Sequence, residues 1–181
     1  MPIRWPTEID AGGGVVLRAP DPIDAEGMTE AIDASLDELR PWMPWAAEPM
    51  SVDQQAVRLA VVREGFVLGG DAGYTITVDG EVAGVIGVHD RLGDPSAREV
   101  GYWLRTSCTG RGAVTRSVTA VLDVLAGAGI TRVVIKCDER NERSAAVARR
   151  AGFTHVGTVD DPSRENPGSS MRTMIWERRL G

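Results

Sequence analysis

The stretch EVGYWLRTSCTGRGAVT, residues 99–115, joins a short apolar run to a glycine-rich turn at the start of a long amphipathic pattern. Glycine allows a backbone to approach a ligand closely and to take conformations that a side chain disfavours. The first turn of a helix offers unpaired N–H groups and the positive end of the helix dipole. Gly110 and Gly112 before an expected helix therefore predict an anion-binding loop, for which a pyrophosphate is a natural ligand. Arg111 and Arg116 could add charge at its rim.

This loop does not identify its ligand by itself. It lacks the Gly-Lys-Ser/Thr ending of a Walker loop and the third glycine of a dinucleotide-binding fingerprint. A tight turn without any ligand is the structural alternative. The segment alone therefore predicts an anion site and no more.

The chain after the loop alternates between helical and extended patterns. Apolar residues at helical spacing predict a long helix, and glycines end it: Val114, Val118, Val121, Leu122 and Leu125, then Gly127 and Gly129. A β-branched run predicts a strand over residues 131–137, and an Ala-rich stretch predicts a short helix over 141–151. Residues 153–159 and 171–177 predict two final strands around a polar loop.

The chain before the quoted stretch begins with a strand and two helices. An apolar run over residues 15–19 predicts the first strand, and helical spacing predicts a helix over residues 24–39. Ser51 is expected to cap the second helix. The packed side of that helix is expected to carry three valines, Val57, Val61 and Val62.

A hairpin follows, because Asp79-Gly80 separates two alternating runs, residues 74–78 and 81–88. Residues 99–104 then predict a third strand of this group. The order of elements indicates the α/β class with a mixed sheet, and no linker or repeat interrupts it. The sequence therefore predicts a single domain that spans residues 1–181.

Composition and charge exclude several classes of function. The formal net charge is −6, from 26 acidic and 20 basic side chains, which disfavours a general nucleic-acid binder. The apolar runs are much shorter than the roughly 20 residues that span a bilayer, so no membrane partner is expected. Two cysteines, Cys108 and Cys137, and two histidines predict neither a disulfide framework nor a metal site. We expect a soluble cytoplasmic protein.

A second motif identifies the ligand class by resemblance. The segment DERNERS, residues 138–144, follows the strand expected over 131–137. Together with the run 99–104 and the glycine loop, it resembles the GNAT superfamily of acyl-CoA N-acyltransferases. It is similar in particular to the branch that contains the ribosomal-protein N-terminal acetyltransferases of the Rim type. The resemblance covers about residues 14–180, and the stretch LRPWMPW, residues 39–45, is also similar to that branch.

The resemblance implies a GNAT-like fold: a central, mostly antiparallel sheet with a splayed parallel strand pair and helices on both faces. It also implies acetyl-CoA as the cofactor, whose pantetheine arm pairs with the splayed strand and whose pyrophosphate meets the loop amides. The implied cofactor-binding residues are Trp103, Leu104, Arg105, Thr109, Gly110, Arg111, Gly112, Ala113, Val114, Thr115, Asn141 and Ser144. The loop departs from the family pattern at two of them. Thr109 stands where Arg or Gln is usual, and Val114 where Gly or Ala is usual.

Transfer of an acyl group to an amine needs a base for the amine and a proton for the departing thiolate. Glu99 is the expected base, directly or through water, because it begins the strand along which the cofactor should lie. Its structural alternative is an ion pair with Arg98 or Arg105. Ser144 is the expected donor to the sulfur, although at this place in a helix it could merely satisfy backbone groups. Asn141 could cap the same helix and still contact the cofactor.

The acceptor site is expected to involve aromatic side chains. The resemblance implies that Trp42 and Trp45 line it, although aromatics at a helix end also cover cores. Tyr102 could contact the substrate, donate a proton in place of Ser144, or pack in the core. Asp160, Asp161 and Glu165 could attract a cationic acceptor or form an ordinary solvated loop.

The acceptor itself stays open at this point. A peptide or protein N-terminal amine is favoured, with direct transfer in a ternary complex. A small amine such as an antibiotic, polyamine or amino acid is the first alternative, and a succinyl-CoA-using enzyme is a variant. A catalytically silent acyl-CoA-binding module is the second alternative. The branch resemblance also suggests a homodimer.

Overall fold

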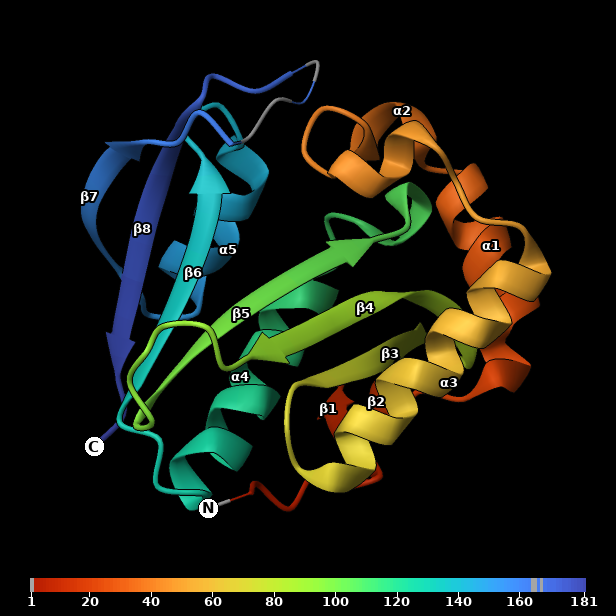
Figure 1. Cartoon of the computed structure of the whole chain (residues 1–181), viewed down its shortest axis with the longest axis horizontal. Coiled ribbons are helices and arrows are strands. Elements are labelled where there is room, and N and C mark those ends of the chain that lie inside the picture. The colour runs from red at the N-terminus through yellow and green to blue at the C-terminus, as the bar shows by residue number, and fades with distance from the viewer. Residues whose placement is uncertain (1, 164–165, 167) are drawn as a thin grey trace.

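The structure is a computed structural model that describes residues 2–163, 166 and 168–181. Its centre is one eight-stranded sheet with the strand order β1-β2-β3-β4-β5-β6-β8-β7 (Figure 1). Strands β5 and β6 are parallel, and the neighbouring pairs on either side of them are antiparallel. The strands are β1 Glu8–Gly12, β2 Val15–Arg18, β3 Ala72–Val78, β4 Glu81–His89, β5 Ala97–Leu104, β6 Arg132–Asp138, β7 Thr154–Asp160 and β8 Arg172–Arg179.

Helices cover both faces of this sheet, as predicted (Figure 1). On one face α4 and α5 bury a large apolar core that includes Val118, Val121 and Leu125. On the other face α1 and α3 enclose a smaller core around Met28 and Leu59. The helices are α1 Ala25–Asp33, α2 Leu36–Leu39, α3 Val52–Leu68, α4 Ala113–Gly127 and α5 Glu142–Arg150, with 3-10 turns η1 Pro22–Asp24, η2 Pro44–Ala47 and η3 Thr106–Cys108.

The parallel pair of strands is splayed. β5 and β6 pair only where Ala97–Glu99 lie opposite Arg132–Val134. Beyond that point β5 remains paired with β4 as far as Leu104, whereas β6 follows β8 as far as Asp138. The two strands therefore diverge, and no strand of the described part of the chain pairs with their facing edges (Figure 1). This confirms the predicted splayed pair.

Two expectations for the first part of the chain were wrong. The strand at Val15 is preceded by β1, whose sequence EIDAG shows no run of large apolar residues. The helix expected over 24–39 is interrupted at Ser35, which is 1% exposed. The Ser35 hydroxyl accepts the Thr106 N–H at 3.0 Å, so a contact 71 residues away in the chain accompanies the break.

Helix α3 starts as predicted but packs with a different face. Ser51 Oγ accepts the Gln54 N–H, and Gln54 Oε1 accepts the Ser51 N–H, which completes a capping box. The expected packed valines were wrong in two cases, because Val57 and Val61 are 66% and 64% exposed. The buried positions of this helix are Gln55, Leu59 and Phe66. The buried Gln55 interrupts the apolar pattern, so the exposed valines gave the stronger periodic signal.

A buried carboxylate at the end of β6 holds the chain before β8. Asp138 is 3% exposed, and its carboxylate accepts the N–H groups of Arg140 at 2.9 Å and Ser170 at 2.8 Å. It also accepts the Ser169 hydroxyl at 3.0 Å. Burial by itself would raise the pKa of Asp138, but these hydrogen bonds favour the charged form and lower the pKa below its ordinary value.

The anchored segment reaches the other side of the splay. A methyl group on Gly168 would lie 2.5 Å from Cβ of Pro41, so the backbone of Gly168 lies directly against the chain that follows α2. Residues 168–171, which we call the strap, therefore connect the end of β6 with the α2 region. Both ends of this connection lie at the wide end of the splay (Figure 1).

Acid should weaken the anchor of the strap. Because the folded-state pKa of Asp138 is depressed, its stabilising contribution is fully present above the ordinary value of about 3.9. It is lost as the pH falls from there through the folded-state pKa. We expect Asp138→Asn to lower the melting temperature at neutral pH, and we expect this difference from the wild type to shrink below about pH 4. Thermal unfolding followed by circular dichroism measures both.

Asp160→Asn is a suitable control, because the Asp160 side chain is 92% exposed. It should change the melting temperature little at any pH. A difference between wild type and Asp138→Asn that is independent of pH would contradict the assignment of the anchor to the charged carboxylate.

Candidate active site

The glycine loop presents free backbone donors to solvent. Gly110 and Gly112 both have φ of 77°, in the left-handed region that favours glycine, and a Cβ at either would meet no heavy atom within 4 Å. Gly112 is the N-cap of α4. The N–H groups of residues 113–115 have no acceptor among the described residues. The loop is therefore an open cradle of amides at a helix N-terminus, which fits a pyrophosphate.

The two residues that depart from the family pattern have structural roles. The Thr109 hydroxyl donates to the Thr106 carbonyl at 2.7 Å, so it shapes the turn before the cradle. Val114 is partly buried and packs against the larger core, next to Ala113. The side chain of Val114 therefore turns away from the ligand side, and its backbone N–H stays available.

Two arginines flank the cradle. Arg111 forms an ion pair of 2.9 Å with Asp79 of the β3–β4 hairpin, and both side chains are more than half exposed. The guanidinium of Arg116 covers the β1–β2 turn, where a Cβ on Gly13 would lie 3.1 Å from it. Exposed ion pairs are weak, so Arg111 can exchange Asp79 for an anionic ligand at little cost.

The end of β5 connects the splay with the segment that forms the cradle. Trp103 is buried, and its ring packs against that of Trp45 with 5.7 Å between centroids. Leu104 is packed against the larger core. The Arg105 side chain turns to α1, where it pairs with Glu30 at 2.9 Å. In an antiparallel ladder alternate residues point their N–H and C=O groups outward, so β5 offers such groups to the splay.

Helix α5 carries Asn141 and Ser144 at the other side of the splay. The Asn141 side chain accepts the Ser144 N–H at 3.0 Å, so Asn141 caps the helix. The Ser144 hydroxyl lies 3.0 Å from the Tyr102 hydroxyl, which also donates to the Ser144 carbonyl at 3.2 Å. Burial raises the pKa of Tyr102, so its phenol stays protonated. The structure thus brings two separately predicted site residues into contact.

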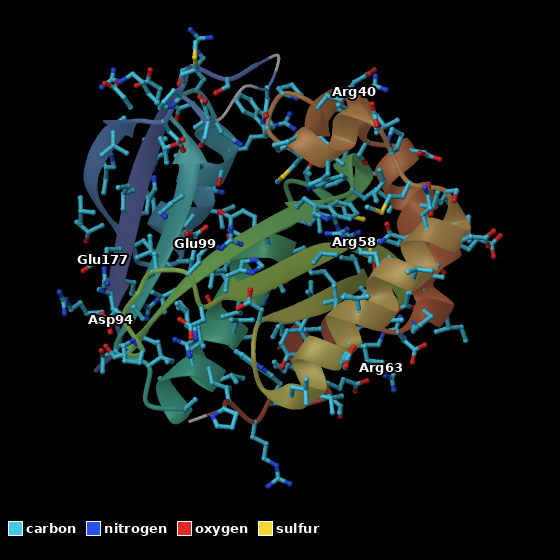
Figure 2. All side chains as sticks on the ribbon, in the orientation of Figure 1. Arg40, Arg58, Arg63, Asp94, Glu99 and Glu177 are labelled. Carbon is cyan, nitrogen blue, oxygen red and sulfur yellow. The ribbon has the colours of Figure 1, made fainter. Side chains whose placement is uncertain are left out.

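Glu99 lies where the parallel pairing ends, between β5 and β6 (Figure 2). Its side chain is 14% exposed. Its Oε2 atom is 2.9 Å from Lys136 Nζ on β6, and its Oε1 atom is 3.9 Å from Arg91 Nε. The alternative pairing with Arg98 or Arg105 is not found, because those side chains pair with Asp90 and Glu30.

Lys136 and Arg91 were missed by the sequence reasoning. Neither belongs to a motif, and the pairing register of β5 with β6 decides that Lys136 approaches Glu99. The alternation along the strands of the predicted sheet is the one sequence signal that could have suggested it.

The two predicted catalytic residues belong to opposite faces of β5. Trp103 packs in the smaller core, whereas Tyr102 packs against the larger core and bonds to α5. Side chains alternate along a strand, so Glu99 shares the face of Trp103. Ser144 lies on the face of Tyr102. A group held in the splay would therefore meet Glu99 from one side and Ser144 from the other.

The predicted acceptor residues are divided between the two faces: Trp45 lies on the Glu99 face, and Tyr102 lies on the opposite face. Trp45 is partly buried and packs on the smaller core, as does Met43. Trp42 follows α2 and is partly buried, and its backbone N–H donates to the Leu39 carbonyl at 3.0 Å. Trp103 Nε1 is buried without a hydrogen-bond partner among the described residues.

The acidic loop is partly engaged with its neighbours. Asp160 pairs with Arg172 at 3.6 Å, and Asp161 accepts the Thr173 hydroxyl at 3.1 Å. Glu165 lies outside the described residues. The Asp161 carboxylate is thus already bonded within the chain and is less available to a cationic acceptor.

One hollow of the surface lies away from the predicted site. It has a volume of about 660 Å³ between α4, the end of α5 and strands β7 and β8, with Arg150, Arg178 and Glu177 in its lining. None of the predicted site residues lines it. Among the described residues, no cluster of three or more His, Cys, Asp or Glu could hold a metal ion, and no helix is long and apolar enough to span a bilayer.

Comparison with known proteins gives consistent matches. The family model described as an acetyltransferase (GNAT) domain matches residues 15–154. A Bacillus subtilis (strain 168) protein, the candidate ribosomal N-acetyltransferase YdaF, is 30% identical over 156 residues, which cover 81% of each chain. The ribosomal-protein-serine acetyltransferase of Escherichia coli (strain K12) is 34% identical over 87 residues, covering 48% of this chain and 49% of that one.

A solved structure agrees with these matches. RimL, a ribosomal L7/L12 alpha-N-protein acetyltransferase in complex with coenzyme A, superposes with a TM-score of 0.88 at 25% identity. The match covers 96% of this chain and 98% of that one. The family model alone covers more than half of the sequence, and the splayed strands and amide cradle are the features that the family resemblance predicted. The chain belongs to the GNAT acetyltransferase family.

Proposed function

We propose that this protein transfers the acetyl group of acetyl-CoA to the α-amine of a peptide or protein N-terminus, by direct attack in a ternary complex. One observation carries the proposal. The amide cradle of α4 opens onto the splay between β5 and β6, where Glu99 and Ser144 approach from opposite faces. The names of the matched relatives support a ribosomal-protein amine as the acceptor.

The residues present fit acetyl-CoA. The free amides of Gly110 to Thr115 would hold its pyrophosphate, with Arg111 and Arg116 as flanking charges. The unpaired edge of β5 would hold the pantetheine arm, near Asn141. Acetyl-CoA supplies an acyl group already activated as a thioester. The remaining work of the protein is to place the amine and to move two protons.

The two protons can move on opposite faces of β5. On one face, Glu99 accepts a proton from the attacking amine, directly or through water, as the new C–N bond forms. On the other, the Ser144 hydroxyl donates its proton to the sulfur as the C–S bond breaks. Glu99 then releases its proton to solvent water, and Ser144 regains a proton from solvent, while the Tyr102 hydroxyl, 3.0 Å from Ser144 Oγ, holds the serine in place. Each proton thus has a donor and an acceptor without a metal ion.

The strap favours a slender acceptor. Its contact between Gly168 and Pro41 lies on the α2 side of the splay, at the wide end. An acceptor that enters beside this connection would reach Glu99 more easily as a chain terminus than as a side chain in the middle of a folded surface. We further propose that residues 1–181 form one domain. The cytoplasmic location and the homodimer stay predictions.

A panel of acceptors tests the function. We expect release of coenzyme A when the protein is incubated with acetyl-CoA and ribosomal proteins or peptides with free N-termini. The same peptides with an acetylated N-terminus are the control and should release none. Thiol detection and mass spectrometry of the product measure the reaction. No release with peptides, proteins or small amines would overturn the proposal, and release with small amines alone would reassign the acceptor.

The cradle predicts a specific effect on cofactor binding. Gly112→Ala places a side chain at a φ of 77°, so the backbone must move although space for the methyl group exists. We expect the Kd for coenzyme A to rise about tenfold, as for a loss of roughly 1–2 kcal/mol from backbone strain or lost amide contacts. Isothermal titration calorimetry measures it.

Gly127→Ala, at the other end of α4, is the matched control. A Cβ there meets nothing within 4 Å, and its φ is outside the left-handed region. The Kd of this variant should equal that of the wild type. Equal affinities for Gly112→Ala and Gly127→Ala would place the nucleotide elsewhere.

The proton-transfer residues predict a loss of rate without a loss of cofactor binding. We expect Glu99→Gln and Ser144→Ala each to lower kcat by about 10²–10⁴-fold, the usual contribution of general acid–base catalysis. The Kd for coenzyme A should change little, which separates chemistry from binding. Glu30→Gln is the control, because Glu30 is exposed and pairs with Arg105 away from the splay. Wild-type rates in both site variants would remove Glu99 and Ser144 from the mechanism.

A further inference from the structure

A cationic side chain, Lys136, lies beside the proposed base Glu99, close to the point where β5 and β6 stop pairing. Lys136 is two residues beyond Val134, the last residue of β6 that pairs with β5. Its Nζ atom is 2.9 Å from Glu99 Oε2, and its side chain is 33% exposed. Alternation along β6 places Lys136 on the same face as Val134 and Asp138, opposite the core side that holds Ile135 and Cys137. Lys136 therefore flanks the carboxylate that is proposed to receive the proton of the amine.

The neighbouring charges leave Lys136 with spare donors. Glu177 of β8 forms ion pairs with Arg132 and Arg179. Asp138, at the end of β6, already accepts hydrogen bonds from backbone amides. Glu99 is the carboxylate that pairs with Lys136 among the described residues. An ammonium group has three donors and no acceptor, so one ion pair leaves two of them free.

We propose that Lys136 binds the first carbonyl oxygen of the acceptor, so that the site selects α-amino acyl compounds, such as peptide N-termini, over plain alkylamines. This inference rests on the proposed function, because it takes Glu99 as the group that receives the amine. It adds a specificity residue, Lys136, and a chemical criterion for the acceptor.

The dimensions of an α-amino acyl group suit the pair. Its nitrogen and its carbonyl oxygen are joined through Cα and the carbonyl carbon, which places them about 3 Å apart when they lie on the same side. The separation of Glu99 Oε2 and Lys136 Nζ is similar, 2.9 Å. Glu99 Oε2 is buried in the closed pair. An α-amine therefore reaches it as the contact with Lys136 opens, and the carbonyl oxygen of the acceptor then comes within reach of Lys136.

An alkylamine offers no such carbonyl oxygen. It has only N–H donors and apolar carbon, so Lys136 would give up part of its pairing with Glu99 and find no acceptor in exchange. A charged group that is left without a partner in a partly buried place is costly. The pair thus favours the peptide terminus, whose carbonyl oxygen accepts from Lys136, and disfavours the alkylamine, which offers that ammonium group no acceptor.

The test compares two acceptors with three variants of the full-length protein. The acceptors are a short peptide with N-terminal alanine and a branched alkylamine of matched length that lacks the carbonyl group. We expect the wild type to prefer the peptide in kcat/KM. Lys136→Met should lower kcat/KM for the peptide by about tenfold to a hundredfold, mainly through KM, as for loss of a charge-assisted hydrogen bond. The value for the alkylamine should fall much less, so the preference disappears.

Two matched variants distinguish recognition from general electrostatics. Lys136→Arg keeps a donor at this place and should retain most of the preference for the peptide. Arg91→Met removes the other cation near Glu99, 3.9 Å from its Oε1 atom, and should leave the preference unchanged. Melting temperature and the Kd for coenzyme A of each variant show that fold and cofactor site are intact.

The outcomes separate this inference from the proposed function. If the wild type acetylates neither acceptor nor any protein, the proposed function fails. If the wild type acetylates the peptide but Lys136→Met lowers kcat/KM equally for both acceptors, Lys136 only positions Glu99, and this inference alone is overturned. A loss of preference in Arg91→Met would also overturn it, because any nearby cation would then suffice.

Discussion

The site depends on the place where β5 and β6 stop pairing. After Glu99 and Val134 each strand keeps its antiparallel partner on the outer side, so neither loses its connection to the sheet. Their inner edges retain unpaired N–H and C=O groups that are costly to leave without partners. An extended arm laid between the strands would satisfy them, much as an added strand does. A gap in a hydrogen-bond ladder thus becomes a binding site for a linear ligand, and the cradle of α4 supplies an anion site beside it.

The splay also divides the chemistry between two sides of the sheet. The face of the larger core carries the capped helix α5. There the cap residue Asn141 and Tyr102 of β5 both bond to Ser144. The opposite face carries Glu99 with Lys136 and, farther along β5, the Trp45–Trp103 contact. A base and an acid that must not neutralise each other are kept apart by the backbone of β5. The strap borders the wide end of the splay, and a buried carboxylate, Asp138, holds it there.

Sequence reasoning succeeded where one segment carries the whole signal. The Asp79-Gly80 hairpin, the caps at Ser51 and Asn141, and the glycines before α4 are local patterns, and the structure contains each of them. It failed where the environment decides. The outward face of α3 carries valines whose spacing suited a core, while Gln55 is buried. The helix expected over 24–39 breaks at Ser35, which bonds to Thr106 far along the chain.

The amino-acid sequence by itself determined the order of strands and helices from α3 onward, the amide cradle, and the family, because these depend on neighbours within a few residues and on the spacing of motifs. The tertiary structure decided which side chains meet: Tyr102 with Ser144, Glu99 with Lys136, and Gly168 with Pro41. The physical reason is that strand register and the alternation of side chains across the sheet orient Tyr102, Glu99 and Lys136, whereas the packing of loops brings Gly168 to Pro41. A shift of one residue would turn these three strand side chains to the other face.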